Sequence, residues 1–265
     1  MTFEEPSKRK INLVKSLVSL KNYRRREGLF VVEGLRAVEE AVNSDYEVEF
    51  VLISDDFLKR YGGKLHGFGD VNIFQVPKKV YKTLSDTQTP QGVMAVVRMR
   101  NYELADLCRG NFLIVALDGV KDPGNMGTII RTADAVGASG VLAGKGCVDV
   151  YNPKVIRATM GSIFHLPVIE EIDLQQALKE LYKKGAKIIV TSLGANKSYL
   201  DVDYKSPAVV VFGSEAEGVS KDILAMPAEQ VKIPIPGKAE SLNVAVSSGI
   251  LLYEAVRQRG TLFPL

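Results

Sequence analysis

The first hundred residues alternate between helical and extended hydrophobic patterns. Apolar residues recur at helical spacing in two segments, and short runs rich in Val, Ile, Leu and Phe are typical of buried strands. The expected helices cover residues 11–22 and 35–42, and the expected strands cover 29–32, 49–53, 72–76 and 93–97. This alternation predicts a small α/β domain.

The rest of the chain repeats the alternation with longer apolar runs. The expected strands are 112–117, 140–143, 187–193, 208–212 and 231–235, and the expected helices are 127–136, 152–164, 174–184 and 243–258. Strands rich in Val and Ile without polar alternation predict a parallel sheet covered on both faces. The order alone suggests a Rossmann-like sheet. The mixed polar stretch 98–110 predicts a boundary between two α/β domains, residues 1–105 and 106–265.

Composition and charge leave room for several partners. A chain of 265 residues, 46% of them apolar, has ample material for a buried core. Its net charge of +3 is uneven, because residues 1–30 hold eight Lys or Arg against three Glu, which leaves −2 for the remainder. The basic runs Lys8-Arg9-Lys10 and Arg24-Arg25-Arg26 can neutralise the phosphates of a nucleic acid. A solvated helix surface explains the same runs, so charge alone leaves both interpretations open.

The sequence lacks the residues and segments that several functional classes require. Cys108 and Cys147 are far apart, so neither a disulfide framework nor a metal site is expected, and a reducing cytoplasm fits. The two histidines, His66 and His165, offer few bases for a hydrolase, and His165 in its apolar setting is typical of a satisfied buried imidazole. Residues 1–6 lack the start of a signal peptide, and no apolar stretch reaches membrane-spanning length. We therefore expect a soluble protein with no membrane partner.

The standard nucleotide-binding signatures are absent as well. The first strand-to-helix loop of the second domain, residues 118–125, lacks the Gly-x-Gly-x-x-Gly pattern that places a pyrophosphate at a helix. No Gly-x-x-x-x-Gly-Lys-Ser/Thr loop occurs either. The expected α/β sheet therefore needs a different cofactor geometry.

Three polar loops follow predicted strands of the second domain. They read Asp122-Pro123-Gly124-Asn125-Met126-Gly127-Thr128-Ile129-Ile130-Arg131, then Phe212-Gly213-Ser214-Glu215-Ala216-Glu217-Gly218, then Ile233-Pro234-Ile235-Pro236 with Ser241-Leu242-Asn243-Val244-Ala245. Ligands of open α/β sheets bind at the carboxyl ends of the strands. The loops are therefore expected to meet in one site that contains a carboxylate, a hydroxyl and an amide.

In this order and spacing, the three loops resemble motifs one, two and three of the SpoU family of RNA ribose 2′-O-methyltransferases, within the SPOUT superfamily. The resemblance covers residues 111–258. Residues 20–42 resemble the amino-terminal substrate-binding domain of the ribosomal-RNA branch, which is similar to ribosomal protein L30e, and residues 157–167 also resemble that branch. The resemblance implies a trefoil-knotted α/β methyltransferase domain that follows a smaller L30e-like α/β domain.

The same resemblance implies an activity. It is the transfer of a methyl group from S-adenosylmethionine to a ribose 2′-hydroxyl of structured RNA, without a metal, with ribosomal RNA as the expected substrate and transfer RNA as the alternative. The resemblance also implies a homodimer formed through the knotted domain, in which each active site draws residues from both subunits, and the cysteine usage noted above favours a cytoplasmic location.

The matching motifs supply candidate catalytic residues. Arg131 matches the arginine beside the target hydroxyl. Because a guanidinium is a poor proton acceptor near neutral pH, we expect Arg131 to hold the target phosphate and stabilise negative charge on the 2′-oxygen. Glu215 is expected to pair with Arg131 or to relay the proton, and Asn125 to orient Arg131. Ser241 and Asn243 are expected to bind ribose or hold the third loop.

The candidate cofactor contacts are apolar or small. Ile233 and Leu242 are expected to contact the adenine, with Leu193 as a further wall residue. Gly213 is expected to leave room for the adenosyl group. Glu217 is expected only to favour the first turn of the helix that follows.

Other interpretations remain open at this stage. Asn125, Ser241 and Asn243 are also ordinary helix-start residues. An RNA-binding protein of ribosome assembly that transfers no methyl group is one rival, and the intact motif residues argue against it. A dinucleotide-dependent oxidoreductase is the second rival, and the missing glycine pattern argues against it.

Overall fold

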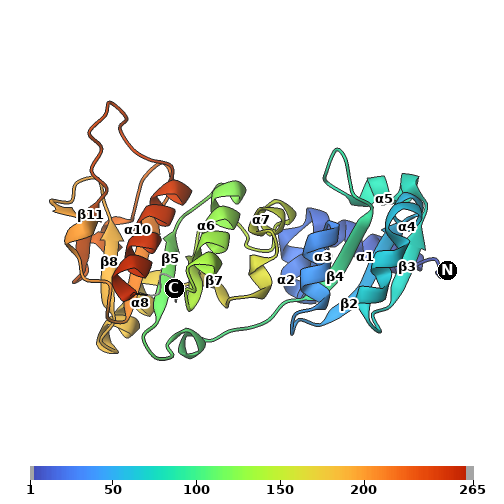
Figure 1. Cartoon of the computed structure of the whole chain (residues 1–265), viewed down its shortest axis with the longest axis horizontal. Helices are drawn as coiled ribbons and strands as arrows, with labels where there is room; N and C mark the ends of the chain where they lie inside the picture. The colour runs from blue at the N-terminus through green and yellow to red at the C-terminus, as the bar shows by residue number, and fades with distance from the viewer. Residues whose placement is uncertain (1–2, 261–265) are drawn as a thin grey trace. The chain divides into compact units, whose positions relative to one another are not determined.

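The structure is a computed structural model that describes residues 3–260. The chain forms two compact units (Figure 1): unit 1 comprises Met1–Arg100 and Tyr151–His165, and unit 2 comprises Asn101–Val150 and Leu166–Leu265. Both are α/β, the fold class that the sequence predicts. The sequence analysis divides the chain once, whereas the structure places the later segment 151–165 in unit 1. Residues 1–2 and 261–265, the ends of the two predicted domains, lie outside the described residues.

Unit 1 is built on a four-stranded sheet. Its strands lie in the order β1 (Leu29–Glu33), β4 (Val93–Arg98), β2 (Val48–Ser54) and β3 (Ile73–Val76). β4 pairs antiparallel with β1 and β2, and β2 pairs parallel with β3. Each strand begins and ends within one residue of its predicted range, because short Val- and Ile-rich runs are a strong local signal.

Helices cover both faces of this sheet. The first 61 residues contribute α1 (Lys8–Ser19), α2 (Lys21–Glu27), α3 (Leu35–Val42) and α4 (Asp55–Tyr61), followed by η1 (Gly62–Phe68) and α5 (Lys78–Leu84). α1 and α5 pack their apolar side chains on one face of the sheet. The single helix predicted over residues 11–22 is two helices, because Leu20 between them adopts an extended conformation.

One of the two basic runs is partly internal. Arg24 is 3% exposed, and its Nη1 donates hydrogen bonds to the carbonyl oxygens of Leu17, at 2.6 Å, and Val18, at 3.3 Å. The arginine thus caps the open carbonyl end of α1. Arg24 contributes to folding, so the phosphate-binding interpretation of this run does not apply to it.

The segment 151–165, which we call the arm, belongs to unit 1. The predicted helix 152–164 is wrong here, because α7 (Pro153–Thr159) ends at Met160 with φ +54° and Gly161 with φ +100°, and the short η3 (Ser162–Phe164) follows. A Cβ on Gly161 would lie 2.8 Å from Glu40 Cγ, so only glycine fits this turn.

Aromatic side chains and one histidine hold the arm. Tyr151 packs on Phe30 with ring centroids 4.8 Å apart, and Tyr46 Oη donates to the carbonyl of Ile163 at 3.2 Å. The side chain of His165 is 43% exposed, and its Nε2 lies 3.2 Å from Glu40 Oε2. The buried-imidazole interpretation of His165 is therefore wrong.

Unit 2 contains a parallel sheet of seven strands. Their order is β7 (Val168–Ile172), β6 (Gly140–Gly144), β5 (Leu113–Asp118), β10 (Ala208–Gly213), β8 (Lys187–Thr191), β11 (Glu229–Lys232) and β9 (Lys197–Ser198). Every pairing is parallel, as predicted. β7 escaped prediction because two glutamates interrupt its apolar run.

The strand order corrects the Rossmann-like expectation. Numbered along the chain, the six longer strands lie in the order 3-2-1-5-4-6, whereas a Rossmann sheet has 3-2-1-4-5-6. The difference arises because β10 lies between β5 and β8. The knot implied by the resemblance stays a prediction.

Helices cover both faces of the second sheet. They are η2 (Leu104–Leu107), α6 (Pro123–Ala135), α8 (Leu174–Lys183), η4 (Tyr199–Asp201), α9 (Lys221–Leu224) and α10 (Val244–Arg259). α10 packs against α6 and β10, and the two helices run side by side (Figure 1). α8 contributes its apolar side chains to the core on the other face. Within residues 3–260, no helix is long and apolar enough to cross a membrane.

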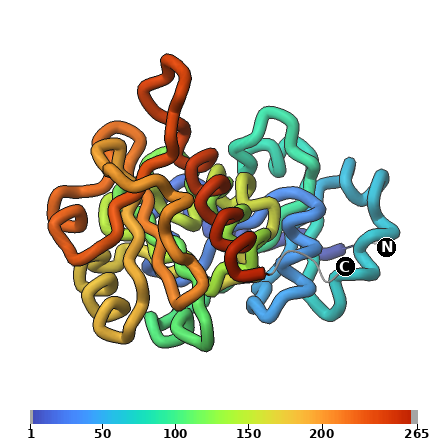
Figure 2. Tube along the Cα trace, turned by 60° about the vertical axis from the view of Figure 1, so that its left-hand side comes forward, coloured from blue at the N-terminus to red at the C-terminus, as the bar shows by residue number. Residues whose placement is uncertain are grey.

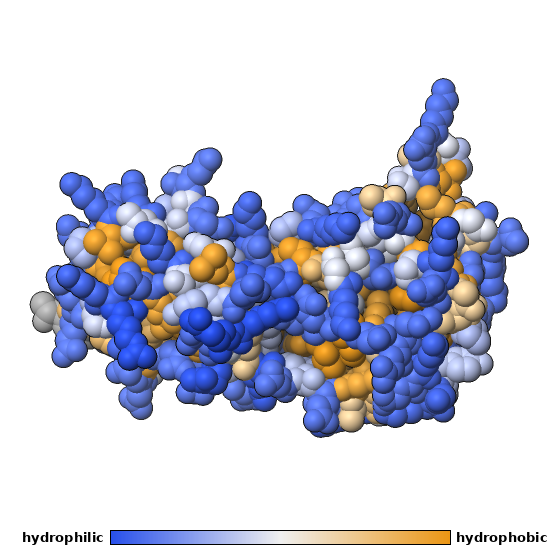
Figure 3. Space-filling model, turned by 180° about the vertical axis from the view of Figure 1, so that it is seen from behind, coloured by the Kyte–Doolittle hydropathy of each residue, from blue (hydrophilic) through white to orange (hydrophobic). Residues whose placement is uncertain are grey.

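The loop from β11 to α10 stands out from unit 2 (Figures 1 and 2). Its tip, residues 236–240, is exposed and includes the charged Lys238 and Glu240, and apolar surface lies nearer the base of the loop (Figure 3). β11 ends at Lys232, three residues before its predicted end, because Pro234 and Pro236 cannot donate the hydrogen bonds of a sheet.

Candidate active site

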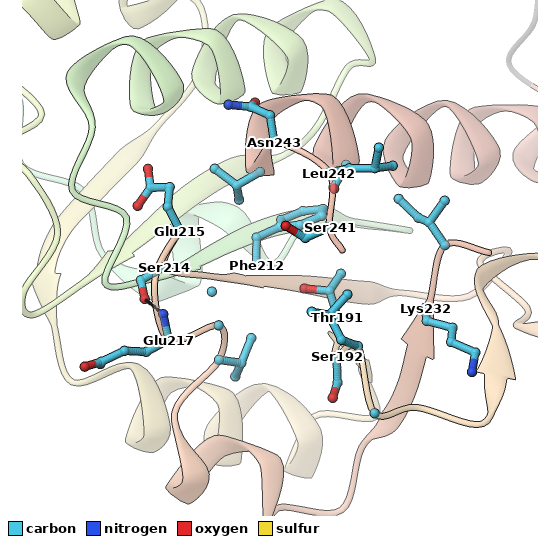
Figure 4. A pocket seen from close by; sticks show the side chains of 18 of the residues that line it. Thr191, Ser192, Phe212, Ser214, Glu215, Glu217, Lys232, Ser241, Leu242 and Asn243 are labelled. Atoms are coloured by element: carbon cyan, nitrogen blue, oxygen red, sulfur yellow. Dashed lines mark hydrogen bonds between the residues drawn. The ribbon is translucent and has the colours of Figure 1, made fainter. Parts of the chain in front are cut away.

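A cavity of about 670 Å³ opens at the carboxyl ends of β8, β10 and β11 (Figure 4). Its walls come from these strand ends, the turn after β10 and the loop before α10. Seven of the nine candidate site residues line it: Leu193, Gly213, Glu215, Ile233, Ser241, Leu242 and Asn243. The structure thus brings the second and third polar loops together around one cavity.

Asn125 connects the first polar loop to the other two. Asn125 Nδ2 donates to Glu215 Oε1 at 2.8 Å, and Asn243 Nδ2 donates to Asn125 Oδ1 at 2.9 Å. The backbone amides of Lys121 and Asp122 also donate to the Glu215 carboxylate, at 3.3 and 3.4 Å. One amide side chain therefore bridges all three loops.

These contacts fix the charge of Glu215. Desolvation acts to raise the pKa of Glu215, but the hydrogen bonds from Asn125 and from backbone amides outweigh it, so the pKa is lowered from its ordinary value. Glu215 is therefore ionised at neutral pH and is a weak proton acceptor there. Glu215 therefore acts as a fixed negative charge that accepts hydrogen bonds from the surrounding loops.

Asn243 combines two structural roles. Its Oδ1 accepts hydrogen bonds from the backbone amides of Ala245, at 2.9 Å, and Val246, at 3.2 Å, and so caps α10. Its Nδ2 is the group that reaches Asn125. Ser241, two residues earlier, is exposed at the cavity, and the described chain provides no hydrogen-bond partner for its hydroxyl. Asn243 thus caps α10 and also forms part of the site.

Uncovered apolar side chains mark one part of the cavity wall. Leu193 is 67% exposed and Leu242 37% exposed, whereas Phe212, which also lines the cavity, is fully buried. Glu215 and Asn243 lie at the end of the cavity away from Lys232 (Figure 4). The cavity therefore offers apolar contact in one part and polar groups in another, as ligand sites do.

Gly213 is required by the chain itself. A Cβ at this position would lie 2.0 Å from the carbonyl carbon of Gly218 and 2.1 Å from the amide nitrogen of Val219. The turn after β10 folds back on the strand through reciprocal backbone hydrogen bonds of 3.0 Å between Ser214 and Gly218. The sequence analysis assigned this glycine to the approach of a ligand, but the closest neighbour is the returning backbone.

Arg131 lies outside the cavity. It is on the exposed side of α6, six residues after Asn125, which corresponds to about 9 Å along the helix axis. Within residues 3–260, no hydrogen bond or ion pair involves its guanidinium. The expected pair with Glu215 does not form within one chain, because Glu215 bonds to Asn125 and the loop amides.

Several polar cavity residues escaped the sequence analysis. Thr191, Ser192 and Lys232 line the cavity from the ends of β8 and β11, and Ser214 and Glu217 do so from the turn after β10. The signal that could have found the first three is their place at the carboxyl end of a predicted strand. Glu217, which we expected only to favour a helix, lies at the cavity as well.

The bridge at Asn125 yields a pH-dependent prediction. We expect Asn125→Asp to place a second carboxylate against Glu215 and to raise one of the two pKa values, since like charges cannot share the site. Stability should then fall relative to the wild-type chain as pH rises from about 5 to 8. Urea unfolding at both pH values measures this, with Asn125→Ala as the control. A pH-independent difference between the two variants would contradict the proposed contact.

Two family models match the chain. The model of the SpoU rRNA methylase family matches residues 112–253, and that of the MRM3-like substrate binding domain matches residues 9–95. The first match contains all three polar loops. The second lies wholly within unit 1.

Similar proteins cover nearly the whole chain. It is 34% identical to the 23S rRNA (guanosine(2553)-2′-O)-methyltransferase RlmP of Bacillus subtilis, over 88% of this chain and 90% of that protein. It is 32% identical to the 23S rRNA (uridine(2479)-2′-O)-methyltransferase of Streptomyces viridochromogenes, over 92% of this chain and 88% of that protein. The crystal structure of the SpoU methyltransferase AviRb from Streptomyces viridochromogenes in complex with AdoMet superposes with a TM-score of 0.85 at 29% identity, covering 95% of this chain and 99% of that one.

Proposed function

This chain belongs to the SpoU rRNA methylase family, and on that premise we propose that unit 2 transfers a methyl group from S-adenosylmethionine to a ribose 2′-hydroxyl of ribosomal RNA presented by unit 1. The protein is an S-adenosylmethionine-dependent RNA methyltransferase. The observation that carries the proposal is the convergence of three loops, through Asn125, at one cavity. We also propose a cytoplasmic location, on the basis of that substrate.

The cavity fits the methyl donor. Its volume of about 670 Å³ lies within the range of about 300–1,000 Å³ that is usual for cofactor sites. We assign Leu193, Ile233 and Leu242 to the apolar part of the ligand, because two of these side chains are left substantially exposed by the fold. Backbone groups of the same loops are available for polar atoms. Bound there, S-adenosylmethionine supplies an electrophilic methyl group.

The chain's own residues position the acceptor and stabilise charge. Asn125, Glu215 and Asn243 hold the loops in one arrangement, which lowers the entropic cost of aligning the reactants. Arg131 has its charge free of partners among the described residues, so it can bind the phosphate beside the target ribose. As the 2′-oxygen loses its proton, the same guanidinium stabilises the negative charge that develops.

The position of Arg131 supports a homodimer. α10 exposes an apolar stripe with helical spacing, and α6, which packs against α10, exposes Arg131. The stripe consists of Val246, Gly249, Ile250 and Tyr253. Such a stripe on a helix that already buries its other face is typical of a contact surface. We assign it to a second copy of the chain, so that Arg131 completes the active site of that copy.

The proposed interface can be broken by one charge. Tyr253 is 52% exposed in the stripe, so we expect Tyr253→Glu to yield monomers and to abolish methyl transfer while the fold persists. Tyr182→Glu is the matched control, because Tyr182 is 50% exposed on α8, away from the stripe. Light scattering gives the mass of each variant. A Tyr253→Glu protein that remains dimeric and active would contradict this assignment.

One experiment separates the proposed activity from its rivals. S-adenosylmethionine and NAD are titrated by calorimetry, and the labelled methyl donor is then incubated with total RNA and the chain. We expect binding of S-adenosylmethionine and label recovered as 2′-O-methylnucleoside. RNA binding without transfer would favour an assembly protein, and NAD binding would favour an oxidoreductase.

A further inference from the structure

Unit 1 contains a second cavity, which shares no lining residue with the first. It has a volume of about 460 Å³ and lies between the start of α3, the loop that leads into β4 and the end of α7. Its wall includes Glu33, Arg36, Gln91, Arg157 and Met160. The residues that close it from α7 belong to the arm 151–165, so the substrate-binding sequence alone does not form it.

At the end of α7, the cavity wall consists of the planar guanidinium of Arg157 and the exposed thioether of Met160. Arg157 Nη1 and Nη2 both donate to the carboxylate of Asp86, the second at 3.1 Å, which fixes the plane of the guanidinium. Met160 is 43% exposed although it is apolar. Its φ of +54° is rare for a residue with a side chain, and the fold maintains it at the cavity wall. Fixed guanidinium planes and soft apolar groups are surfaces on which flat aromatic ligands stack.

The rim presents one fixed donor and one open acceptor. Gln91 Oε1 accepts a hydrogen bond from the backbone amide of Leu35 at 2.8 Å, which leaves its Nε2 group held at the rim. Glu33 Oε1 accepts hydrogen bonds from Ser85 Oγ at 2.6 Å and Tyr81 Oη at 3.3 Å. Glu33 Oε2 accepts none from residues 3–260. Burial raises the pKa of the Glu33 carboxyl, so the open oxygen gains from a ligand N–H.

The charges favour a base over a bare phosphate inside the cavity. Glu33 and Glu39 balance Arg36 and Arg157 on its wall, and Arg157 is already paired with Asp86. Arg36 is exposed, and across the described chain its guanidinium makes no ion pair or hydrogen bond. A flat ligand with donors and acceptors on its edge suits the interior, and one phosphate suits Arg36.

We propose that this cavity binds one unstacked base of the RNA substrate. The base stacks against Arg157 and Met160, its edge meets Gln91 Nε2 and Glu33 Oε2, and its flanking phosphate meets Arg36. The inference rests on the proposed function, since it takes RNA as the ligand. Proteins read RNA sequence mostly from such splayed bases in loops and bulges. Unit 1 would then select its RNA by a base as well as by shape.

The test uses the full chain and deproteinised 23S ribosomal RNA from cells that lack the gene. KM for this RNA and kcat for methyl transfer are measured for Arg36→Ala and Met160→Gly. The matched control for charge is Arg60→Ala, an exposed arginine of α4 that does not line the cavity. We expect KM to rise about tenfold or more in the two cavity variants with kcat unchanged. The control should stay within about twofold of wild type.

Ultraviolet crosslinking without methyl donor supplies a second readout. We expect RNA attached to the peptide that contains residues 85–91 or to the one that contains Met160. Equal KM changes in Arg36→Ala and Arg60→Ala, or crosslinks confined to other peptides, would overturn the base-binding site while leaving methyl transfer intact. If the wild-type chain crosslinks at the cavity but transfers no methyl group, the proposed activity fails and the RNA site stands.

Discussion

Replacing Arg131 by alanine is expected to lower kcat for methyl transfer by about a hundredfold to a thousandfold, the usual cost of removing a group that stabilises developing oxyanion charge. Binding of S-adenosylmethionine should be unchanged, because Arg131 does not line the cavity. Stability should also be unchanged, since the side chain is exposed and no described residue pairs with it. Single-turnover transfer, calorimetry and thermal unfolding measure the three quantities.

A mixed dimer tests where Arg131 acts. We mix two variant chains, one with Arg131→Ala and the other with Leu242→Glu. The second substitution places a charge in the cavity wall and leaves Arg131 in place. If each site combines a cavity from one copy with Arg131 from the other, random pairing restores about a quarter of wild-type activity. Each variant alone should be inactive. Mixtures that stay inactive would show that Arg131 serves the cavity of its own chain.

Replacing Gly213 by alanine is the second change with a large expected effect. The added Cβ would meet backbone atoms of Gly218 and Val219 at 2.0 and 2.1 Å, and backbone cannot move aside as a flexible side chain can. We expect a loss of about 1–3 kcal/mol or more in the free energy of unfolding. The turn that carries Glu215 should also shift, so affinity for S-adenosylmethionine should fall at least about tenfold.

Gly237→Ala is the matched control. Gly237 lies in the loop between β11 and α10, and a Cβ there would meet no atom within 4 Å. The substitution should be neutral or stabilise by up to about 1 kcal/mol through the unfolded chain. Urea unfolding measures the stability of both variants, and calorimetry measures their affinity for S-adenosylmethionine. Equal stability of the two would mean that the turn after β10 does not pack as described.

Local signals in the sequence suffice for most strands and for the meeting of the loops. The runs that form β1, β2, β4 and β10 are short, apolar and bounded by turns, so their strands can be read directly. The three polar loops converge because parallel strands end at one edge of a sheet. That general rule, together with the motif match, places Glu215 and Asn243 at the same cavity.

Long-range packing is what the sequence leaves out. The insertion of β10 between β5 and β8 depends on how the chain returns through the sheet, which no periodicity encodes. The segment 151–165 follows β6 in sequence, yet it packs in unit 1 through Tyr151 and Phe164 against aromatic partners far away in the chain. Likewise, the requirement for glycine at position 213 is visible only in the folded structure, where the turn after β10 packs against this residue.

The most direct measurement maps ribose methylation in ribosomal RNA from three strains: one that carries the gene, one that lacks it, and one that carries only the Arg131→Ala allele. A 2′-O-methyl group protects the adjacent phosphodiester from alkaline cleavage, so each modified position is read as a gap in the cleavage ladder. We predict one protected position that disappears in the deletion strain, returns with the wild-type gene and stays absent with Arg131→Ala. Identical ladders in all three strains, or a methyl group found on a base, would contradict the account.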